Sequence, residues 1–169
     1  SFAQIYNPIL ALKVLQQLMV SHPNAQLSMV GPFKDDSIDT CKAYAAKHQL
    51  PVTFTGGMPK ADWLAYAQDF DIFINTTNVD NTPVSVIEAM ALGLPVVTTN
   101  VGGIPYLLED QKEALLVPPD DVHAMAQAII SLVQNPEITK RLSVAGRKKV
   151  EAFDWEVVKE KWMEILNLR

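Results

Sequence analysis

The sequence predicts an α/β fold, a doubly wound, Rossmann-like parallel sheet with helices on both faces. Five short apolar segments alternate with stretches in which apolar residues recur at helical spacing, which is the pattern of repeated βα units. The apolar segments are almost continuously apolar, as strands are when helices cover both faces of a parallel sheet. With 169 residues, the chain is long enough for one ordinary domain and too short for two. We therefore expect residues 1–169 to form a single domain.

The strands and helices are expected to alternate along the whole chain. Strands are predicted at residues 27–30, 52–55, 71–75, 95–99 and 114–117. The first helix is predicted to begin at Pro8, with Asn7 as its N-cap, because proline suits the first position of a helix. Further helices are predicted at residues 36–48, 60–68, 84–92, 104–108, 122–133, 136–152 and 155–167.

The last three predicted helices carry additional signals. The residues that precede them, Asp121, Asn135 and Asp154, are of types that commonly cap helices. Trp155 and Trp162 are seven residues apart, a spacing that predicts a buried helix face.

The composition excludes several classes of function. A net charge of −5 argues against nucleic acid as a partner. Cys41 is the single cysteine; it cannot form an intramolecular disulfide and fits a reducing compartment, so we expect a cytoplasmic protein. The three histidines are far apart and lack cysteine or carboxylate neighbours at ligand spacing, so we expect no metal site. The dinucleotide fingerprint and the P-loop motif are both absent from the sequence.

Ligands of doubly wound sheets bind beyond the carboxyl ends of the strands. The loops that follow predicted strands are therefore the candidates, at residues 31–35, 56–59, 76–83 and 100–105. The last of these contains Gly102 and Gly103, which allow close approach of the backbone to a ligand or to a neighbouring helix.

Glu88 is the only charged side chain between residues 81 and 108, and it lies on the predicted helix 84–92. Burial of an ionised group costs several kcal/mol unless a specific partner holds it. The partner is either the hydroxyl groups of a ligand, or a backbone amide or distant lysine of the protein itself. Asp80 lies eight residues earlier in the loop, where an aspartate either contacts a ligand or serves as a turn residue.

The segment between these two carboxylates favours an anionic ligand. Asn81, Thr82, Pro83, Val84 and Ser85 lead into the predicted helix, and the amides of a first helical turn have no partner within the helix. Those amides and the helix dipole can hold a diphosphate. Pro83 has no N–H group and itself contributes no donor.

These residues resemble a known family. The spacing of Asp80 and Glu88, followed by AMALGLPVVTTNVGGIPYLL, resembles the signature segment of retaining glycosyltransferases of the group 1 type, family 4. Similar segments follow the family's order: LSMVG at 27–31, VTFTGGMPKADW at 52–63, DIFINTT at 71–77, ALLVPPDD at 114–121 and FDWEVV at 153–158. The resemblance covers nearly the whole chain and implies the C-terminal, nucleotide-sugar-binding domain of a GT-B enzyme, with an N-terminal acceptor-binding domain outside this sequence.

The resemblance also implies roles for individual residues. Glu88 would bind the ribose of the nucleotide, and Asp80 would act in catalysis beside the hydroxyl groups of the donor sugar. The loop between them would hold the diphosphate, and the turn after the second strand would lie beside the base. The remaining residues expected in this donor site are Asn81, Thr82, Pro83, Val84, Gly31, Gly56 and Met58.

The sequence departs from the family's pattern at three places. Asp80 replaces the usual glutamate, and Asn81 and Pro83 replace glycines. Tyr6 and Asn7 stand where a lysine and a glycine that bind phosphate are usual. The family's central first strand would precede this sequence, so either residues 1–6 fill part of its place or another chain supplies a strand.

The function implied by the resemblance is transfer of a hexose from a nucleoside diphosphate sugar to a hydroxyl acceptor, without a metal or other cofactor. Synthesis of surface or cell-wall glycans is expected, in the cytoplasm or at the inner face of the membrane, with membrane contact through the N-terminal half. We expect this domain alone to be inactive. Two alternatives stay open, a nucleotide-sugar epimerase or hydrolase of the same fold, and a non-catalytic sugar-nucleotide-binding module.

Overall fold

A computed structural model describes residues 2–166 of the chain. The strands are β1 (Leu27–Val30), β2 (Val52–Gly56), β3 (Phe73–Asn75), β4 (Val96–Thr99) and β5 (Leu115–Val117). The α-helices are α1 (Pro8–Leu18), α2 (Ser37–His48), α3 (Lys60–Tyr66), α4 (Val84–Ala91), α5 (Ile104–Leu107), α6 (Val122–Gln134), α7 (Pro136–Val150) and α8 (Trp155–Ile165). Short 3-10 helices are η1 (Gln4–Tyr6), η2 (Ala67–Asp69) and η3 (Glu151–Phe153). None of the helices within residues 2–166 is long and apolar enough to span a bilayer.

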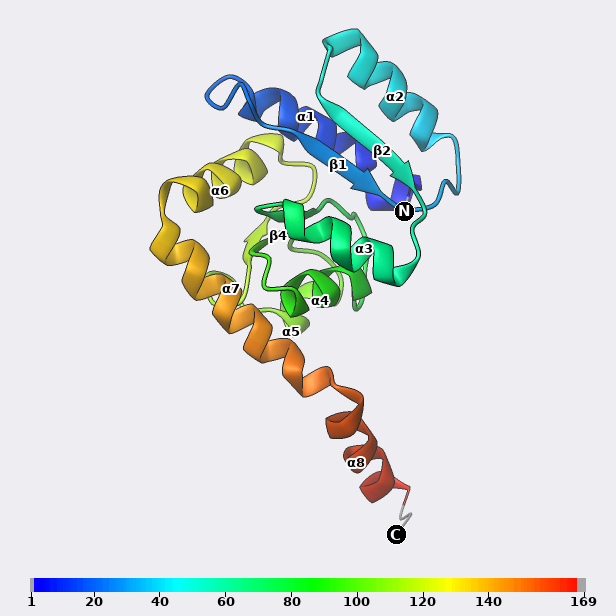
Figure 1. Cartoon of the computed structure of the whole chain (residues 1–169), viewed down its shortest axis with the longest axis vertical. Helices are drawn as coiled ribbons and strands as arrows, with labels where there is room; N and C mark the ends of the chain where they lie inside the picture. Colours follow the sequence, from blue (N-terminus) through cyan, green and yellow to red (C-terminus); the bar gives the residue numbers. More distant parts are fainter. Residues whose placement is uncertain (1, 167–169) are drawn as a thin grey trace.

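All pairs of neighbouring strands are parallel, and helices cover the strands on both faces, so the predicted α/β fold is confirmed (Figure 1). The pairing is divided, however, into two sheets. One sheet holds β1 and β2, and the other has the order β3-β4-β5. Across the described residues, no ladder joins β1 to β3.

The strand β4 organises the core because its side chains alternate between two layers of helices. Val96 packs with Val86 and Met90 of α4, whereas Val97 packs with residues of α1 and α6. Successive residues of a strand point to opposite faces, so α4 and α6 lie on opposite sides of β4. A third cluster, which contains Phe2, packs α1 and α2 against β1 and β2.

The helix ends confirm two of the predicted caps. Side-chain oxygens of Asp121 and Asp154 accept hydrogen bonds at 2.8 and 2.9 Å from amides in the first turns of α6 and α8. Asn135 occupies the N-cap position of α7 as predicted but makes no side-chain capping bond there, because its side-chain amide donates back to the carbonyl oxygen of Ser131 at 2.8 Å. Asn7 precedes α1 as predicted but makes no capping bond, and its side-chain amide donates to the loop before α6 instead.

The predicted burial of Trp155 and Trp162 is also wrong. Their exposed fractions are 67% and 54%. Helix α7 packs against α4 through buried residues such as Leu142 and Val150, whereas α8 continues away from the sheets and protrudes from the body of the molecule (Figure 1). The apolar spacing is real, but no other element of residues 2–166 covers that face. Residue 167 of the predicted last helix lies outside the described residues.

Candidate functional site

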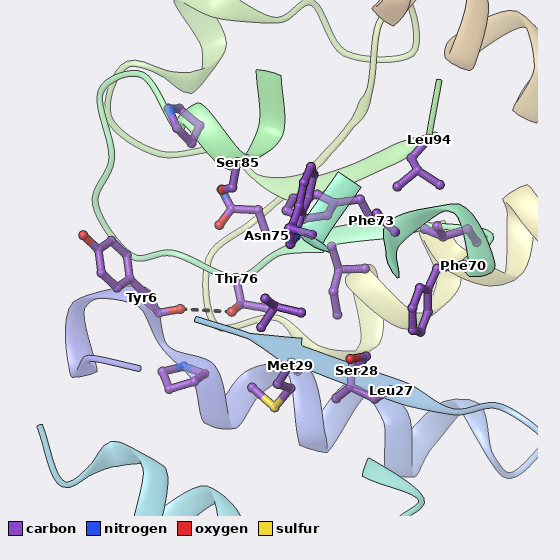
Figure 2. A pocket seen from close by; sticks show the side chains of 18 of the residues that line it. Tyr6, Leu27, Ser28, Met29, Phe70, Phe73, Asn75, Thr76, Ser85 and Leu94 are labelled. Atoms are coloured by element: carbon purple, nitrogen blue, oxygen red, sulfur yellow. Dashed lines mark hydrogen bonds between the residues drawn. The ribbon is translucent and has the colours of Figure 1, made fainter. Parts of the chain in front are cut away.

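The loop between β3 and α4 carries Asp80 and is anchored on both of its sides. The hydroxyl group of Thr76 donates to the carbonyl oxygen of Tyr6 at 3.0 Å (Figure 2), and the amide of Asn78 donates to the carbonyl oxygen of Ile5 at 2.9 Å. From β4, the hydroxyl group of Thr99 donates to the backbone of the same loop at 2.6 Å. The loop is therefore held between η1 and the carboxyl end of β4, where the fold predicts a ligand site.

Two glycines of the loop after β4 fix the backbone around Asp80. The amide of Gly103 donates to the carbonyl oxygen of Asp80 at 2.8 Å. A Cβ atom on Gly103 would lie 2.1 Å from the carbonyl oxygen of Asn81, and one on Gly102 would lie 2.2 Å from that of Asp80. No side chain fits in either position, so these glycines serve close packing of two loops. The sequence allowed a ligand or a neighbouring helix to approach these glycines. In the structure the backbone of Asp80 and Asn81 does so.

A cavity of about 530 Å³ opens beside the loop. Asp80, Thr82, Pro83 and Val84 are among its lining residues. In Figure 2 Asn75, Thr76 and Ser85 lie toward one end of the wall, and Phe70 and Leu94 lie toward the other, where Ser28 is the labelled polar residue. Asp80 is half-buried, and within the described part of the chain its carboxylate has no hydrogen-bond partner. It is therefore free to accept hydrogen bonds from a ligand.

The first turn of α4 adds free donors to this end of the cavity. Helix α4 begins at Val84, and its N-cap residue Pro83 makes no side-chain capping bond. The amide of Val86 bonds back to the carbonyl oxygen of Pro83 at 3.0 Å. By contrast, the amides of Val84 and Ser85 have no acceptor among residues 2–166. Their side chains are exposed, so this positive helix end can reach an anion.

Glu88 lies one turn further along α4 and is paired with a lysine. Its side chain is 23% exposed, and its Oε1 accepts a hydrogen bond from Nζ of Lys60. The distant-lysine alternative for Glu88 is therefore the one realised in this structure, and the carboxylate is less buried than its apolar sequence neighbours had indicated. Lys60 was missed by the sequence reasoning, because a lysine at the start of a helix is too common to signal a site.

The ion pair connects Glu88 to the loop after β2. Lys60 opens α3 directly after the turn that contains Gly56 and Met58. Gly56 in turn accepts a hydrogen bond at 2.8 Å from the amide of Gly31 at the end of β1. These residues and Asn81 do not line the cavity beside Asp80. The structure thus brings Asp80, Thr82, Pro83 and Val84 together and places Glu88 next to α3.

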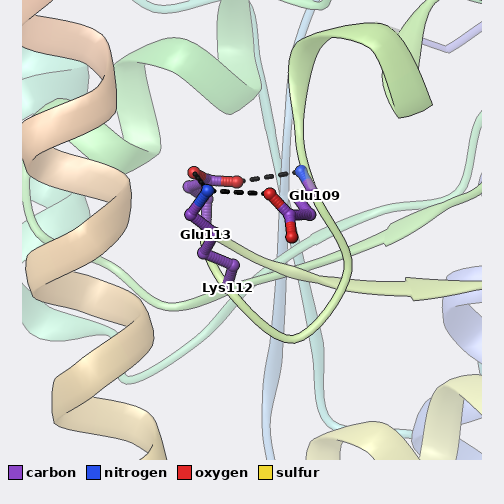
Figure 3. A network of polar contacts seen from close by, with 3 residues as sticks. All are labelled: Glu109, Lys112 and Glu113. Carbon is purple, nitrogen blue, oxygen red and sulfur yellow. Dashed lines mark hydrogen bonds and ion pairs between the residues drawn. The ribbon is translucent and has the colours of Figure 1, made fainter.

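A second polar cluster lies at the other end of β5 and is not part of this site. Lys112 pairs with Glu109 at 2.7 Å and with the buried Glu113 at 3.8 Å (Figure 3). Glu113 also accepts a hydrogen bond at 2.9 Å from the amide of Glu109. The hydrogen bond to Glu109 raises the pKa of Lys112. The cluster closes the turn before the amino end of β5, so its role is structural.

Comparison with known protein families identifies the family to which the chain belongs. The sequence profile described as "Glycosyl transferases group 1" matches residues 2–149. The chain belongs to the glycosyl transferases group 1. The resemblance noted in the sequence is thereby confirmed at the level of this family.

Individual group 1 relatives give the scale of the similarity. Sulfoquinovosyl transferase SQD2 of Arabidopsis thaliana is 32% identical over 158 residues, which are 89% of this chain and 29% of that protein. Sucrose-phosphate synthase of Thermosynechococcus elongatus superposes with a TM-score of 0.80 at 27% identity and covers 92% of this chain. The chain spans 41% of that synthase. It is therefore similar to less than half of each relative.

Another solved structure has lower sequence identity to this chain and is similar to it in fold alone. Alr3699/HepE of Anabaena, solved in complex with UDP and glucose, superposes with a TM-score of 0.90 at 19% identity. The match covers 98% of this chain and 46% of the Anabaena chain. The described residues thus share the fold of the matched part of the Anabaena chain.

Proposed function

We propose that this chain is the donor-binding domain of a retaining glycosyltransferase of family 4, which transfers a hexose from a nucleoside diphosphate sugar to a hydroxyl acceptor. The observation that carries the proposal is the loop that leads into α4. It presents the unpartnered carboxylate of Asp80 beside the unpaired amides of Val84 and Ser85, so acceptors for sugar hydroxyls adjoin donors for phosphate. The solved complex of the Anabaena relative with UDP and glucose supports the same ligand class.

In the proposed complex the diphosphate lies against the amino end of α4. The amides of Val84 and Ser85 donate to phosphate oxygens, and the helix dipole favours the negative charge. Asp80 accepts hydrogen bonds from hydroxyl groups of the donor sugar. Glu88 accepts hydrogen bonds from the ribose diol, for which it must give up Lys60. The base lies beside the turn of Gly56 and Met58, with Gly31 behind that turn.

The proposed reaction breaks the bond between the anomeric carbon and the leaving phosphate oxygen, and the acceptor oxygen bonds to that carbon on the same face. Positive charge develops on the sugar in the transition state, and the leaving diphosphate gains negative charge. Amides that are already oriented toward the diphosphate stabilise that charge without reorganisation. We propose that these donors, together with basic groups of the longer enzyme, replace a metal ion.

The acceptor is proposed to bind to an N-terminal domain of a longer protein, because the chain spans 29% of the plant relative and 41% of the synthase. Catalysis then takes place between two domains, and this domain alone should bind the donor without turning it over. We further propose a role in surface or cell-wall glycan synthesis in the cytoplasm, with peripheral membrane contact through the N-terminal half.

Calorimetric titration with UDP, GDP and ADP in the presence of EDTA tests the proposal. We expect saturable binding that prefers one base. Glu88→Gln should weaken that binding by about tenfold or more, because hydrogen bonds to a charged acceptor contribute about 1.5–3 kcal/mol. Glu109→Gln serves as the matched control, since Glu109 lies in the distant cluster, and should leave the affinity unchanged. Absence of binding by all three diphosphates, or unaltered affinity in Glu88→Gln, would contradict the proposal.

A further inference from the structure

An aromatic side chain is exposed in the loop that follows β1. Phe33 is 50% exposed, and its loop lies at the carboxyl end of a parallel strand, where ligands of such sheets bind. A single exposed apolar side chain is common on protein surfaces. The surroundings of the ring therefore decide whether Phe33 has a role in binding.

The ring borders an open space above the turn that follows β2. Apart from neighbouring residues, a Cβ atom on Gly56 would meet only Cζ of Phe33, at 3.8 Å, and the nearest atoms to one on Gly57 belong to Pro32, at 3.9 Å. The amide of Gly31 donates to the carbonyl oxygen of Gly56 at 2.8 Å and joins the two loops. Phe33, Gly56 and Gly57 thus form one surface at the carboxyl ends of β1 and β2, which we name the shelf.

Two contacts hold the ring of Phe33 and leave it accessible. The buried ring of Phe2 packs against it in a T-shaped arrangement, with the ring centroids 5.4 Å apart. The ammonium group of Lys42 lies 5.4 Å from the centroid of the Phe33 ring. Lys42 is exposed, and a cation–π contact of an exposed lysine contributes little, so a ligand that stacks on the ring can displace it.

The turn beside the ring supplies backbone donors. The amides of Gly57 and Met58 have no acceptor within the described range, residues 2–166. An aromatic ring beside free amides suits a flat heterocycle, which offers a face for stacking and acceptor atoms along its edge. A nucleobase is a ligand of this kind.

The shelf is continuous with the proposed donor site. Lys60 follows the turn after β2 and is paired with Glu88. Glu88 in turn lies about one turn of α4 beyond the free amides of Val84 and Ser85. Phe33, Glu88 and the amino end of α4 therefore follow one another in the order of base, ribose and diphosphate.

We propose that Phe33 holds the base of the nucleoside diphosphate, which stacks on the exposed face of its ring. This inference rests on the proposed function, because it names the residue that binds one part of that ligand. The amides of Gly57 and Met58 lie at the edge of the stacked base and donate to its acceptor atoms. Stacking accepts any base, since each has a π-face. Phe33 thus supplies affinity, whereas the amides of the turn contribute to the choice of base.

Calorimetric titration of Phe33→Leu with UDP, GDP and ADP tests the proposal. Leucine keeps an apolar side chain and removes the ring, so we expect the diphosphate that binds the wild type most tightly to bind about tenfold more weakly, a loss typical of one stacked base. Phe33→Tyr keeps the ring and should bind as the wild type does. Phe153→Leu is the matched control, because Phe153 is a 42% exposed aromatic residue in η3, and should leave the affinity unchanged.

Phe33→Trp gives a direct reading of stacking. An indole ring that stacks against a base loses fluorescence, and the three native tryptophans are present in both proteins. We expect the diphosphate to quench the fluorescence of Phe33→Trp more than that of the wild type.

The outcomes separate this inference from the proposed function. When the wild type binds a diphosphate, equal affinity in Phe33→Leu, or equal quenching in Phe33→Trp and the wild type, would overturn the inference and leave the proposed function standing. Absence of binding of all three diphosphates to the wild type would overturn both.

Discussion

Asp80 and Glu88 are eight residues apart in the sequence, but the structure holds them by different means. Asp80 is positioned through its backbone, which accepts the hydrogen bond of Gly103, while its carboxylate stays free. Glu88 is positioned through its side chain, which pairs with Lys60. A ligand can therefore use Asp80 without breaking a protein contact, whereas its use of Glu88 displaces a lysine.

The first prediction concerns Gly103. Gly103→Ala places a Cβ atom where the backbone of Asn81 now lies, 2.1 Å from its carbonyl oxygen. We expect it to displace the acidic loop, to lower the free energy of unfolding by about 2 kcal/mol, and to weaken nucleotide binding. Urea denaturation and calorimetry measure the two effects.

Gly57→Ala is the matched control, because its Cβ atom would meet only Pro32 at ordinary contact distance, 3.9 Å. It should change the free energy of unfolding little; it is a control for stability alone, because Gly57 lies in the turn proposed to lie beside the base. Wild-type stability in Gly103→Ala would show that the two loops do not pack as described.

A second prediction at this scale concerns Cys41. Its side chain is fully buried, and burial raises the pKa of the thiol to about 11. At pH 8 only about one thiol in a thousand is then ionised, and the thiolate is the reactive form. Alkylation by iodoacetamide, followed by mass spectrometry, should be very slow in the native protein and fast in guanidinium chloride. Equal rates in the two conditions would mean that Cys41 is accessible.

The sequence located Asp80 and Glu88 because both follow from local signals, a loop after a strand and a charge in an apolar helix. It could not locate Lys60, which reaches Glu88 from another helix 28 residues away. Nor could it show that Gly103 packs on Asn81. Such contacts depend on which loops meet in space, and local periodicity carries no information about that.

At the scale of elements, the capping of α6 provides a third prediction. Asp121 accepts a hydrogen bond from Ala124 at 2.8 Å, and loss of such a cap costs about 1 kcal/mol. Asp121→Ala should therefore lower the free energy of unfolding by about 1 kcal/mol. In urea denaturation this appears as a lower midpoint concentration. Asn135→Ala should cost less than half as much, because the side chain of Asn135 makes no bond to the first turn of α7 and only an exposed one to Ser131. Equal losses in the two variants would contradict the assignment of the caps.

Helix α8 marks the limit of element-level reasoning from sequence. The spacing of Trp155 and Trp162 correctly predicted a helix with an apolar stripe, since periodicity reports which residues share a face. It predicted burial wrongly, because burial requires an element that covers the face. Helix α8 runs away from the sheets (Figure 1).

At the scale of the whole molecule, the sequence predicted all five strands to within two residues. Each strand is a short, almost continuously apolar segment between turns, and that signal is local. The order of the strands was not predictable in the same way, and the division into two sheets appears only in the structure. Which strands become hydrogen-bonded neighbours, such as β3 and β4, depends on how the helices that connect them pack.

The central claim is that a nucleoside diphosphate binds where Asp80 and the amino end of α4 meet. The most direct measurement is a backbone amide NMR titration with the diphosphate that binds most tightly. Our account predicts saturable shifts at Val84 and Ser85, whose amides are free, and at Met58 in the turn before α3. Shifts confined to the cluster around Glu113, or to the basic residues Arg147, Lys148 and Lys149 in the last turn of α7, with Val84 and Ser85 unmoved, would contradict it.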